Sequence, residues 1–522
     1  MPPATHNDAT GLVLSTTEGS SCTVQTLPPE LLLQIFMKNT ELDDPSHNQL
    51  HTARRSSQVC RLWREQLLGF PTVWGRLLGL EYYECVGNDW RQEVLSRTRG
   101  ALLWITGSVT QSTSGFFFSV LEEKWGKVEV LEITCKWNPA PGFRRTIWPI
   151  LQRDAPSLES IILRDESASL GDLEMQSPTR TSSTTLFNGV APRLRTLNIF
   201  PQFYFDATAP WLSDLRDLKL FAYHTVPMIL SILKSTPLLR ILRIIGDKKE
   251  TSSSTEYADL ELPSLPHLES LELSGCPTFL SSILESIDFP TRRRQLRRLF
   301  IGTCHHEHSD IPTRTLESVQ HAVMKRIQAY MDDFPPKYIY LSEIRVDAFY
   351  PTIFIRDPPT WDAPEESNSL FITIALSSSL RLLIHRLAAS PSFSAVQKLQ
   401  TSIGGTIEAM VPLYKALHSV TDLSVDSDSA YKLFDGMDQY PLFPSLNVLR
   451  LTRDAPIRYL HNFYSQLLDF VENRALIGSP LSILHLPKSD VCRLSDVHTS
   501  CLYGIPGLVV NLTTRSGCLS DN

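Results

Sequence analysis

Residues 268–276 read LESLELSGC, and residues 296–304 read LRRLFIGTC, which is the same pattern with other variable residues. Each copy has an apolar residue, two variable residues, a second apolar residue, one variable residue and a third apolar residue. Apolar residues at every second position predict a β-strand with one buried face. Because the pattern recurs along the chain, the repeat predicts the fold.

The clear copies of the pattern are VEVLEI from Val128, LESIIL from Leu158, LRTLNI from Leu194, LRDLKL from Leu215, LRILRI from Leu239, LESLEL from Leu268 and LRRLFI from Leu296. The fainter copies are LSEIRV from Leu341, VTDLSV from Val420, LNVLRL from Leu446, LSILHL from Leu481 and IPGLVV from Ile505, with LFITIA from Leu370 as a candidate for the gap between 341 and 420. The first six steps are about 30, 36, 21, 24, 29 and 28 residues long. Segments with helical periodicity lie between copies, and the polar or Pro-rich stretches 166–188, 247–257 and 356–369 are expected to be long loops.

This alternation of strand and helix resembles the leucine-rich repeat family, whose unit has about 20 to 29 residues. Cys276 and Cys304 stand where the consensus of that family has Asn or Cys. The resemblance implies an irregular α/β solenoid over residues 79–514, with a parallel sheet on its concave face. Such a frame favours protein binding over catalysis.

The variable strand positions carry several basic residues that are candidates for contact with a target protein. An ordinary solvated surface is the alternative interpretation of each one. The candidates are Arg195, Arg216, Lys219, Arg243 and Arg297, with Arg298 beside the last.

The N-terminal part has a different pattern. Residues 26–39, TLPPELLLQIFMKN, place apolar residues at helical spacing, and Pro28 and Pro29 suit the first turn of a helix. Residues 51–74, HTARRSSQVCRLWREQLLGFPTVW, put Val59, Leu62, Trp63 and Leu67 on one face, which predicts a second helix that ends before Pro71. Two short helices bury too little apolar surface to be stable alone, so this segment is expected to dock onto something.

These two segments resemble the F-box family. The matching residues are Leu27-Pro28-x-Glu30-Leu31-Leu32-x-x-Ile35-Phe36, Val59-Cys60-Arg61-x-Trp63 and Pro71-x-Val73-Trp74, about 50 of the 522 residues. The resemblance implies a three-helix module over residues 23–78 that binds the Skp-type adaptor of a cullin ubiquitin ligase. By position it assigns adaptor contact to Leu27, Pro28, Leu31 and Ile35, and internal packing to Leu62, Trp63 and Trp74.

The two resemblances together predict a non-catalytic substrate-recognition subunit, in which the F-box binds the adaptor and the repeats bind an unidentified target protein. One alternative keeps both domains but makes the chain an adaptor-bound scaffold without a role in ubiquitination. Another places an enzyme site in the least repetitive part, 341–420. That part has no ordered set of nucleophile, base and orienting acid, which disfavours an enzyme.

Composition excludes several other classes of protein. Hydrophobic residues make up 42% and charged residues 20%, which is typical of a folded chain, although 1–22 are expected to be disordered and 515–522 to form a tail. A net charge of −7 does not favour nucleic acid as a partner. The chain has no apolar run of about 18 residues and no signal-peptide pattern, so we expect an intracellular protein of the cytoplasm or nucleus that does not span a membrane.

Three further sequence features do not predict a site of their own. Cys304 to His308 is rich in metal-binding residue types, but adjacent side chains do not readily turn toward one ion, and we expect no metal there. TRRRQLRR at 291–298 has the composition of an anion-binding patch but overlaps a repeat strand. Nine cysteines without a CxxC pair indicate free thiols, and the absence of nucleotide-binding motifs predicts no cofactor.

Overall fold

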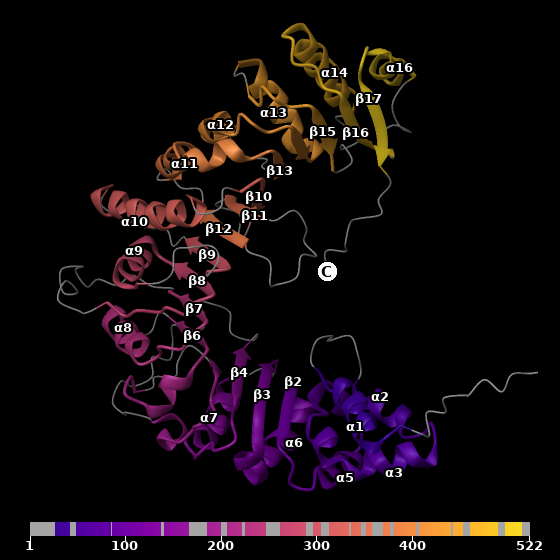
Figure 1. Cartoon of the computed structure of the whole chain (residues 1–522), viewed down its shortest axis with the longest axis vertical. Coiled ribbons are helices and arrows are strands. Elements are labelled where there is room, and N and C mark those ends of the chain that lie inside the picture. The colour runs from indigo at the N-terminus through magenta and orange to yellow at the C-terminus, as the bar shows by residue number, and fades with distance from the viewer. Residues whose placement is uncertain are drawn as a thin grey trace, which may run out of the picture. The chain divides into compact units, whose positions relative to one another are not determined.

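The computed structural model describes residues 27–41, 49–84, 86–136, 140–165, 185–199, 206–221, 225–246, 262–288, 296–303, 313–332, 336–345, 351–357, 369–375, 380–402, 407–439, 442–452, 460–488 and 496–513. Its contacts divide the chain into two compact units. The first unit extends to Ile150 and takes in 165–167, and the second holds the remaining residues. Helices come first, and an α/β region built on parallel strands follows (Figure 1).

The first unit begins with five helices: α1 Pro29–Lys38, α2 Gln49–Ser56, α3 Arg61–Gly69, α4 Pro71–Gly75 and α5 Asn88–Thr98. Helices α1 and α2 both pack against α3, and α4 packs against α5. Pro29 occupies the first turn of α1, where a main-chain N–H has no partner within the helix. Pro71 does the same at the start of α4.

The predicted second helix is wrong in one respect, because it is two helices. A turn at residues 57–59 separates α2 from α3, and the side chain of Val59 is 63% exposed instead of sharing the buried face. Cys60 ends the turn in an extended conformation, and its Sγ accepts a hydrogen bond from the main-chain N–H of Trp63 at 3.4 Å. A Ser or Asn side chain commonly caps a helix in this way.

Three parallel strands complete the first unit: β1 Leu78–Gly79, β2 Leu103–Val109 and β3 Val128–Cys135. The short 3₁₀-helices Leu80–Tyr83 and Trp125–Lys127 and the helices α6 Gln111–Lys124 and α7 Ala140–Leu151 connect or flank these strands. Pairing of Leu78 with Ile105, and of Ile105 with Leu131, shows two further copies of the strand pattern, GRLLGL from Gly75 and LLWITG from Leu102. Each has a glycine where the pattern expects an apolar residue, so neither copy was recognisable from the sequence pattern.

The first half of the second unit carries six strands in sequence order: β4 Ser160–Asp165, β5 Thr196–Asn198, β6 Asp217–Phe221, β7 Ile241–Ile245, β8 Ser270–Gly275 and β9 Arg298–Thr303. Each pairs in parallel with the next. Between them lie the 3₁₀-helices Leu186–Gly189 and Pro210–Asp214 and the helices α8 Val226–Lys234 and α9 Pro277–Ser286. Every clear strand copy from Leu158 to Leu296 is thus a strand. Leu186 and Phe187 are buried, so the predicted loop 166–188 is wrong at its C-terminal end.

The second half of this unit contains α10 Thr313–Asp332, β10 Tyr338–Arg345, β11 Pro351–Asp357, β12 Ser369–Ala375, α11 Leu380–Ala388, the 3₁₀-helix Pro391–Ala395, β13 Lys398–Ser402, α12 Ile407–Ala416, β14 Asp422–Val425, α13 Ser427–Gln439, β15 Val448–Leu451, α14 Leu460–Leu476, β16 Ile483–Pro487, α16 Asp496–Gly504 and β17 Val509–Thr513. Strands β13 to β17 again pair in parallel and in order. Helices α8 to α14 lie along one side of the strands (Figure 1).

The strand order reverses in the middle of the second unit. The sheet runs β9, β12, β11, β10, β13, and β11 is antiparallel to both of its neighbours. The expected loop 356–369 is therefore wrong at its ends, because Arg356 and Asp357 belong to β11 and Ser369 to β12. The predicted copy LSEIRV is out of register, since Ile339 pairs with Leu399 and Leu341 is the last apolar residue of its copy.

A repeated turn leads into β4 to β8 and β13 to β15. The first apolar residue of a copy donates its main-chain N–H to the carbonyl three residues earlier, as Leu194 does to Ala191 and Leu446 does to Phe443. Proline often follows the accepting residue, as in Ala155-Pro156, because its fixed φ suits the second position of a type I turn. The accepting residues are buried, so the repeat includes an apolar position before the first leucine.

The second residue of each copy sets the register of the next strand. The carbonyl of Arg216 accepts the N–H groups of Arg240 and Ile241, both at 2.8 Å, and the carbonyl of Thr421 accepts those of Asn447 and Val448, both at 2.9 Å. We call these carbonyls the carbonyl row. It consists of Glu159, Arg195, Arg216, Arg240 and Glu269, just before β4 to β8, and Lys337, Gln397, Thr421, Asn447 and Ser482, just before β10 and β13 to β16, where Ser482 accepts one N–H group, from Val509. Beyond the row, burial alternates along strands such as β6, β7, β14 and β15, so that one face packs on the helices and the other is open.

Replacement of Gly75 by Ala should destabilise the first unit. Gly75 is buried, and a methyl group there would overlap the main-chain oxygen of Leu102. We expect Gly75→Ala to lower the free energy of unfolding by about 1–3 kcal/mol, the usual cost of overpacking. Gly115→Ala is the matched control, because its methyl group would meet no atom within 4 Å on α6 and should raise that free energy by up to about 1 kcal/mol. Urea unfolding followed by tryptophan fluorescence measures both, and equal effects would contradict the prediction.

Candidate protein-interaction surfaces

An apolar stripe lies along one side of α1. Leu31 and Ile35 are four residues apart within α1, which places them on the same side of the helix, and Leu27 lies two residues before the helix begins. Leu31 and Ile35 are 44% and 48% exposed, Leu27 is half-buried, and Pro28 before the helix is exposed. Half-exposed leucine and isoleucine side chains in a row are typical of a surface that a partner covers.

The opposite side of α1 holds the helix in the first unit. Leu32 and Phe36 are buried, and the ring of Phe36 meets the edge of Trp63 at a centroid distance of 5.3 Å. Trp63 is half-buried, and its indole N–H has no acceptor among the described residues. Leu62 beside it is also half-buried.

Trp74 is enclosed from two sides. It is 1% exposed and donates its indole N–H to the carbonyl of Leu67 at 2.8 Å. From α5, the guanidinium of Arg97 lies 4.5 Å from the ring centre, which adds a cation–π contact. Arg97 of α5 therefore helps to hold in place the helical segment that precedes β1.

The family model described as F-box-like matches residues 24–78, which span α1 to α4 and the first residue of β1. Residues 24–78 form an F-box-like domain. No curated protein matches the chain. The apolar stripe of α1 belongs to this F-box-like domain. F-box proteins are typically adaptors without catalytic activity of their own.

The second surface is the open face of the strands, and the basic candidate residues fall at two places relative to it. Lys219 and Arg243 lie on the open face, opposite each other on β6 and β7. Arg195 and Arg216 belong to the carbonyl row, and Arg297 holds the equivalent position just before β9. Arg298 is the exposed first residue of β9.

The first open-face cluster consists of Asp217, Lys219, Arg243 and Glu272. Arg243 Nη1 donates to both oxygens of Asp217, at 2.9 and 3.2 Å, and Arg243 Nε lies 3.6 Å from Glu272 Oε2. Burial raises the pKa of Asp217 and outweighs the opposing effect of Arg243, and burial lowers the pKa of Lys219 against the attraction of Glu272. Two cations and two carboxylates thus neutralise one another within the cluster.

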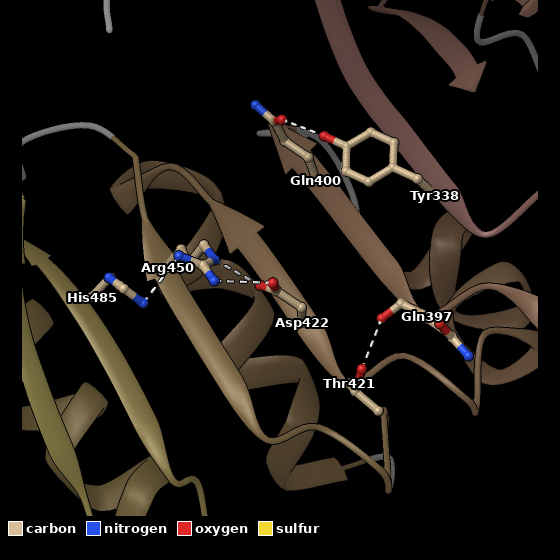
Figure 2. A network of polar contacts seen from close by, with 7 residues as sticks. All are labelled: Tyr338, Gln397, Gln400, Thr421, Asp422, Arg450 and His485. Carbon is tan, nitrogen blue, oxygen red and sulfur yellow. Dashed lines mark hydrogen bonds and ion pairs between the residues drawn. The ribbon is translucent and has the colours of Figure 1, made fainter. Parts of the chain in front are cut away.

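The second open-face cluster consists of Asp422, Ser424, Arg450 and His485 on β14, β15 and β16. Figure 2 shows Asp422, Arg450 and His485. Arg450 donates through Nε and Nη2 to the two oxygens of Asp422, at 2.9 and 3.1 Å, and its Nη1 lies 3.0 Å from Nε2 of His485. Burial lowers the pKa of His485, the charge of Arg450 lowers it further, and Asp422 opposes both. His485 is therefore neutral at neutral pH, with Nε2 accepting from Arg450.

A separate hydrogen bond lies on two neighbouring strands of the same run. The Tyr338 hydroxyl donates to Oε1 of Gln400 at 2.6 Å, between β10 and β13 (Figure 2). None of Gln400, Asp422, Arg450 and His485 was among the sequence candidates. An aspartate at the third position of one copy followed by an arginine at the fifth position of the next would have identified the pair.

Several sequence features lie outside the described residues or remain without a site. Cys304 to His308 and residues 291–295 are outside the described part of the chain. Among the residues that the structure does describe, no three His, Cys, Asp or Glu side chains are grouped as metal ligands. No helix in the described ranges has both the length and the apolar composition that a membrane crossing requires.

Loss of Arg243 should expose the cost of burying Asp217. We expect Arg243→Gln to lower the free energy of unfolding at pH 7 by about 1–3 kcal/mol, less than for a fully buried pair, because the two side chains are 30% and 19% exposed. Without Arg243 the raised pKa of Asp217 should rise further. The deficit should then vanish as the pH falls through that pKa to below the ordinary value of 3.8, where Asp217 is protonated in both states.

Arg240→Gln is the matched control for Arg243→Gln. Arg240 is 56% exposed and only 3.6 Å from Glu269, so its loss should change the free energy of unfolding by less than about 0.5 kcal/mol at every pH. Urea unfolding across the pH range measures both variants. A deficit of Arg243→Gln that stays constant with pH would contradict the role assigned to Asp217.

Proposed function

We propose that the chain is the substrate-recognition subunit of a Skp-cullin-F-box type ubiquitin ligase, with an F-box over 23–78 and repeats over 79–514. The observation that carries this proposal is the F-box-like match at residues 24–78 together with the half-exposed Leu31 and Ile35 on α1. In this proposal Leu27, Pro28, Leu31 and Ile35 contact the adaptor, and Leu62, Trp63 and Trp74 support α1 from within.

The strand ladder supports the binding part of the proposal. The carbonyl row and the buried strand positions hold a regular frame, while the open-face side chains differ from strand to strand. A rigid frame with variable side chains suits recognition of one protein surface without catalysis. The chain would therefore bring a target to the ligase, and ubiquitin transfer would take place on other subunits.

The double variant Leu31→Ala with Ile35→Ala tests the adaptor contact. Both side chains are about half exposed, so their truncation should leave folding intact, as circular dichroism would show. Binding to the Skp-type adaptor should weaken by at least about 30-fold, equivalent to about 2 kcal/mol, because apolar anchors carry most of the energy of such an interface. Gln34→Ala, on an exposed residue of the same helix, is the control and should bind normally. Undiminished binding by the folded double variant would refute the contact assignment.

Co-purification distinguishes the ligase subunit from an adaptor-bound scaffold. A tagged chain in its native cell should recover both the adaptor and the cullin, and proteins bound to its repeats should carry ubiquitin linkages that decline when Leu31 and Ile35 are both Ala. Recovery of the adaptor without the cullin would favour the scaffold.

A further inference from the structure

The two open-face clusters occupy equivalent positions in the strand pattern. In each one, an aspartate at the third position of a copy meets an arginine at the fifth position of the next, Asp217 with Arg243 and Asp422 with Arg450. The strand register is also the same: Lys219, Arg243 and Glu272 lie opposite one another on β6, β7 and β8, as Ser424, Arg450 and His485 do on β14, β15 and β16.

The clusters differ in the partner on the far side of the arginine. Arg243 has a carboxylate on each side, Asp217 and Glu272. Arg450 has Asp422 on one side and the neutral His485 on the other, and Ser424 replaces Lys219. The second cluster therefore lacks both the extra carboxylate and the extra cation of the first.

Arg450 retains the capacity to bind an anion. Its contacts with Asp422 and His485 use three of the five N–H groups of a guanidinium, and the described chain supplies no acceptor for the other two. Its side chain is 40% exposed, whereas that of Asp422 is 14% exposed. The guanidinium is thus held by a largely enclosed carboxylate while part of its own surface is open to solvent.

We propose that Arg450 and His485 together bind an acidic side chain of the target protein, so that a carboxylate lies beside Arg450 as the Glu272 carboxylate lies beside Arg243. This inference rests on the proposed function, because it assigns the class of target segment that the repeats recognise. The bound carboxylate and a protonated His485 would supply the charges that Glu272 and Lys219 supply in the first cluster. Charge complementarity is local, since the whole chain has a net charge of −7 and has no general attraction for acidic partners.

Binding should be coupled to uptake of a proton. In the free chain Nε2 of His485 faces Arg450 as an acceptor, and it must be protonated to donate to a carboxylate placed between them. The charged groups that face His485 are Arg450 and Asp422, and β17 presents Asn511 opposite it, which does not titrate. The pKa of His485, lowered in the free chain, should rise in the complex, so affinity should increase as the pH falls.

The test measures binding of a fluorescein-labelled peptide of alternating Ser and Glu to the full-length chain by fluorescence anisotropy. A peptide with Gln in place of Glu is the uncharged probe, and inorganic phosphate is tested as a competitor. We expect the Glu peptide to bind more tightly than the Gln peptide. The affinity for the Glu peptide should also rise as the pH falls, by up to about tenfold for each pH unit between the free and bound pKa of His485. Equal affinity for the two peptides at all pH values would overturn the proposal.

Two variants localise the effect. His485→Gln keeps an acceptor for Arg450 but does not titrate, so it should remove the pH dependence, and Arg450→Lys should weaken Glu-peptide binding by about tenfold because the planar fork is lost. Arg240→Gln removes one positive side-chain charge at a residue outside the cluster and should leave binding unchanged. Equal losses in Arg450→Lys and Arg240→Gln would indicate general electrostatic attraction and overturn the assignment. The assignment would also be overturned if phosphate competed with the peptides while the chain bound the Glu peptide and the Gln peptide equally well.

A second readout does not depend on the variants. Carbon-13 labelling of histidine rings gives the pKa of His485 by NMR titration, and the Glu peptide should raise it, whereas an unchanged value would refute proton-coupled binding. Adaptor binding is measured on the same preparation. Loss of Glu-peptide discrimination with normal adaptor binding would refute this inference alone, and failure of adaptor binding would refute the proposed function.

Discussion

In the parallel runs β4 to β9 and β10, β13 to β17, each strand after the first takes its register from one main-chain carbonyl at the start of the strand beside it. That carbonyl accepts two N–H groups, as at Arg216 and Thr421, and the two apolar residues that follow then fall on the helix side of the sheet. A slip by one residue would turn those apolar residues outward, so the carbonyl row and the buried positions require the same register. Side chains on the open face take no part in this constraint and are free to differ.

The reversal around β11 divides this regular structure into two runs of parallel strands. Antiparallel neighbours need only a short connection, and β10, β11 and β12 form an antiparallel meander within the sheet. Parallel pairing resumes from β10 to β13, and with it the carbonyl row. Each run then carries one Asp–Arg cluster, so the interruption separates two surfaces of similar design and different charge chemistry.

Local patterns were predictable from the sequence, and long-range pairing was not. The strands from Leu158 to Leu296 follow from alternation alone, and the start of α1 follows from Pro28, Pro29 and the apolar spacing. Two kinds of strand copy were missed. VQKLQT from Val396 ends in Thr401, a buried hydroxyl 3.2 Å from the hydroxyl of Tyr414, and the copies at Gly75 and Leu102 contain glycine.

The helix break at Val59 was missed for a related reason. Spacing alone continues the helix through Val59, whereas the thiol of Cys60 caps a new one. The site candidates show a similar limit. Basic residues were singled out one at a time, and the sequence does not state that the carboxylate of Asp217 on the neighbouring strand already engages Arg243. Partners across strands depend on register, and register emerges only when all the turns and pairings are assembled.

Pairing within a cluster bears on recognition as well as on stability. An exposed arginine such as Arg216 must give up side-chain freedom when it binds a partner, and such residues serve mainly to speed and orient encounters. Arg450 has already lost that freedom, because both oxygens of Asp422 hold its guanidinium. An anion that meets its outer edge therefore gains a fixed geometry at little entropic cost. In the first cluster the carboxylate of Glu272, 3.6 Å from Arg243 Nε, already places a second negative charge beside the guanidinium. The difference between a structural cluster and a recognition cluster on this sheet thus depends on the one residue that follows the arginine in the strand order.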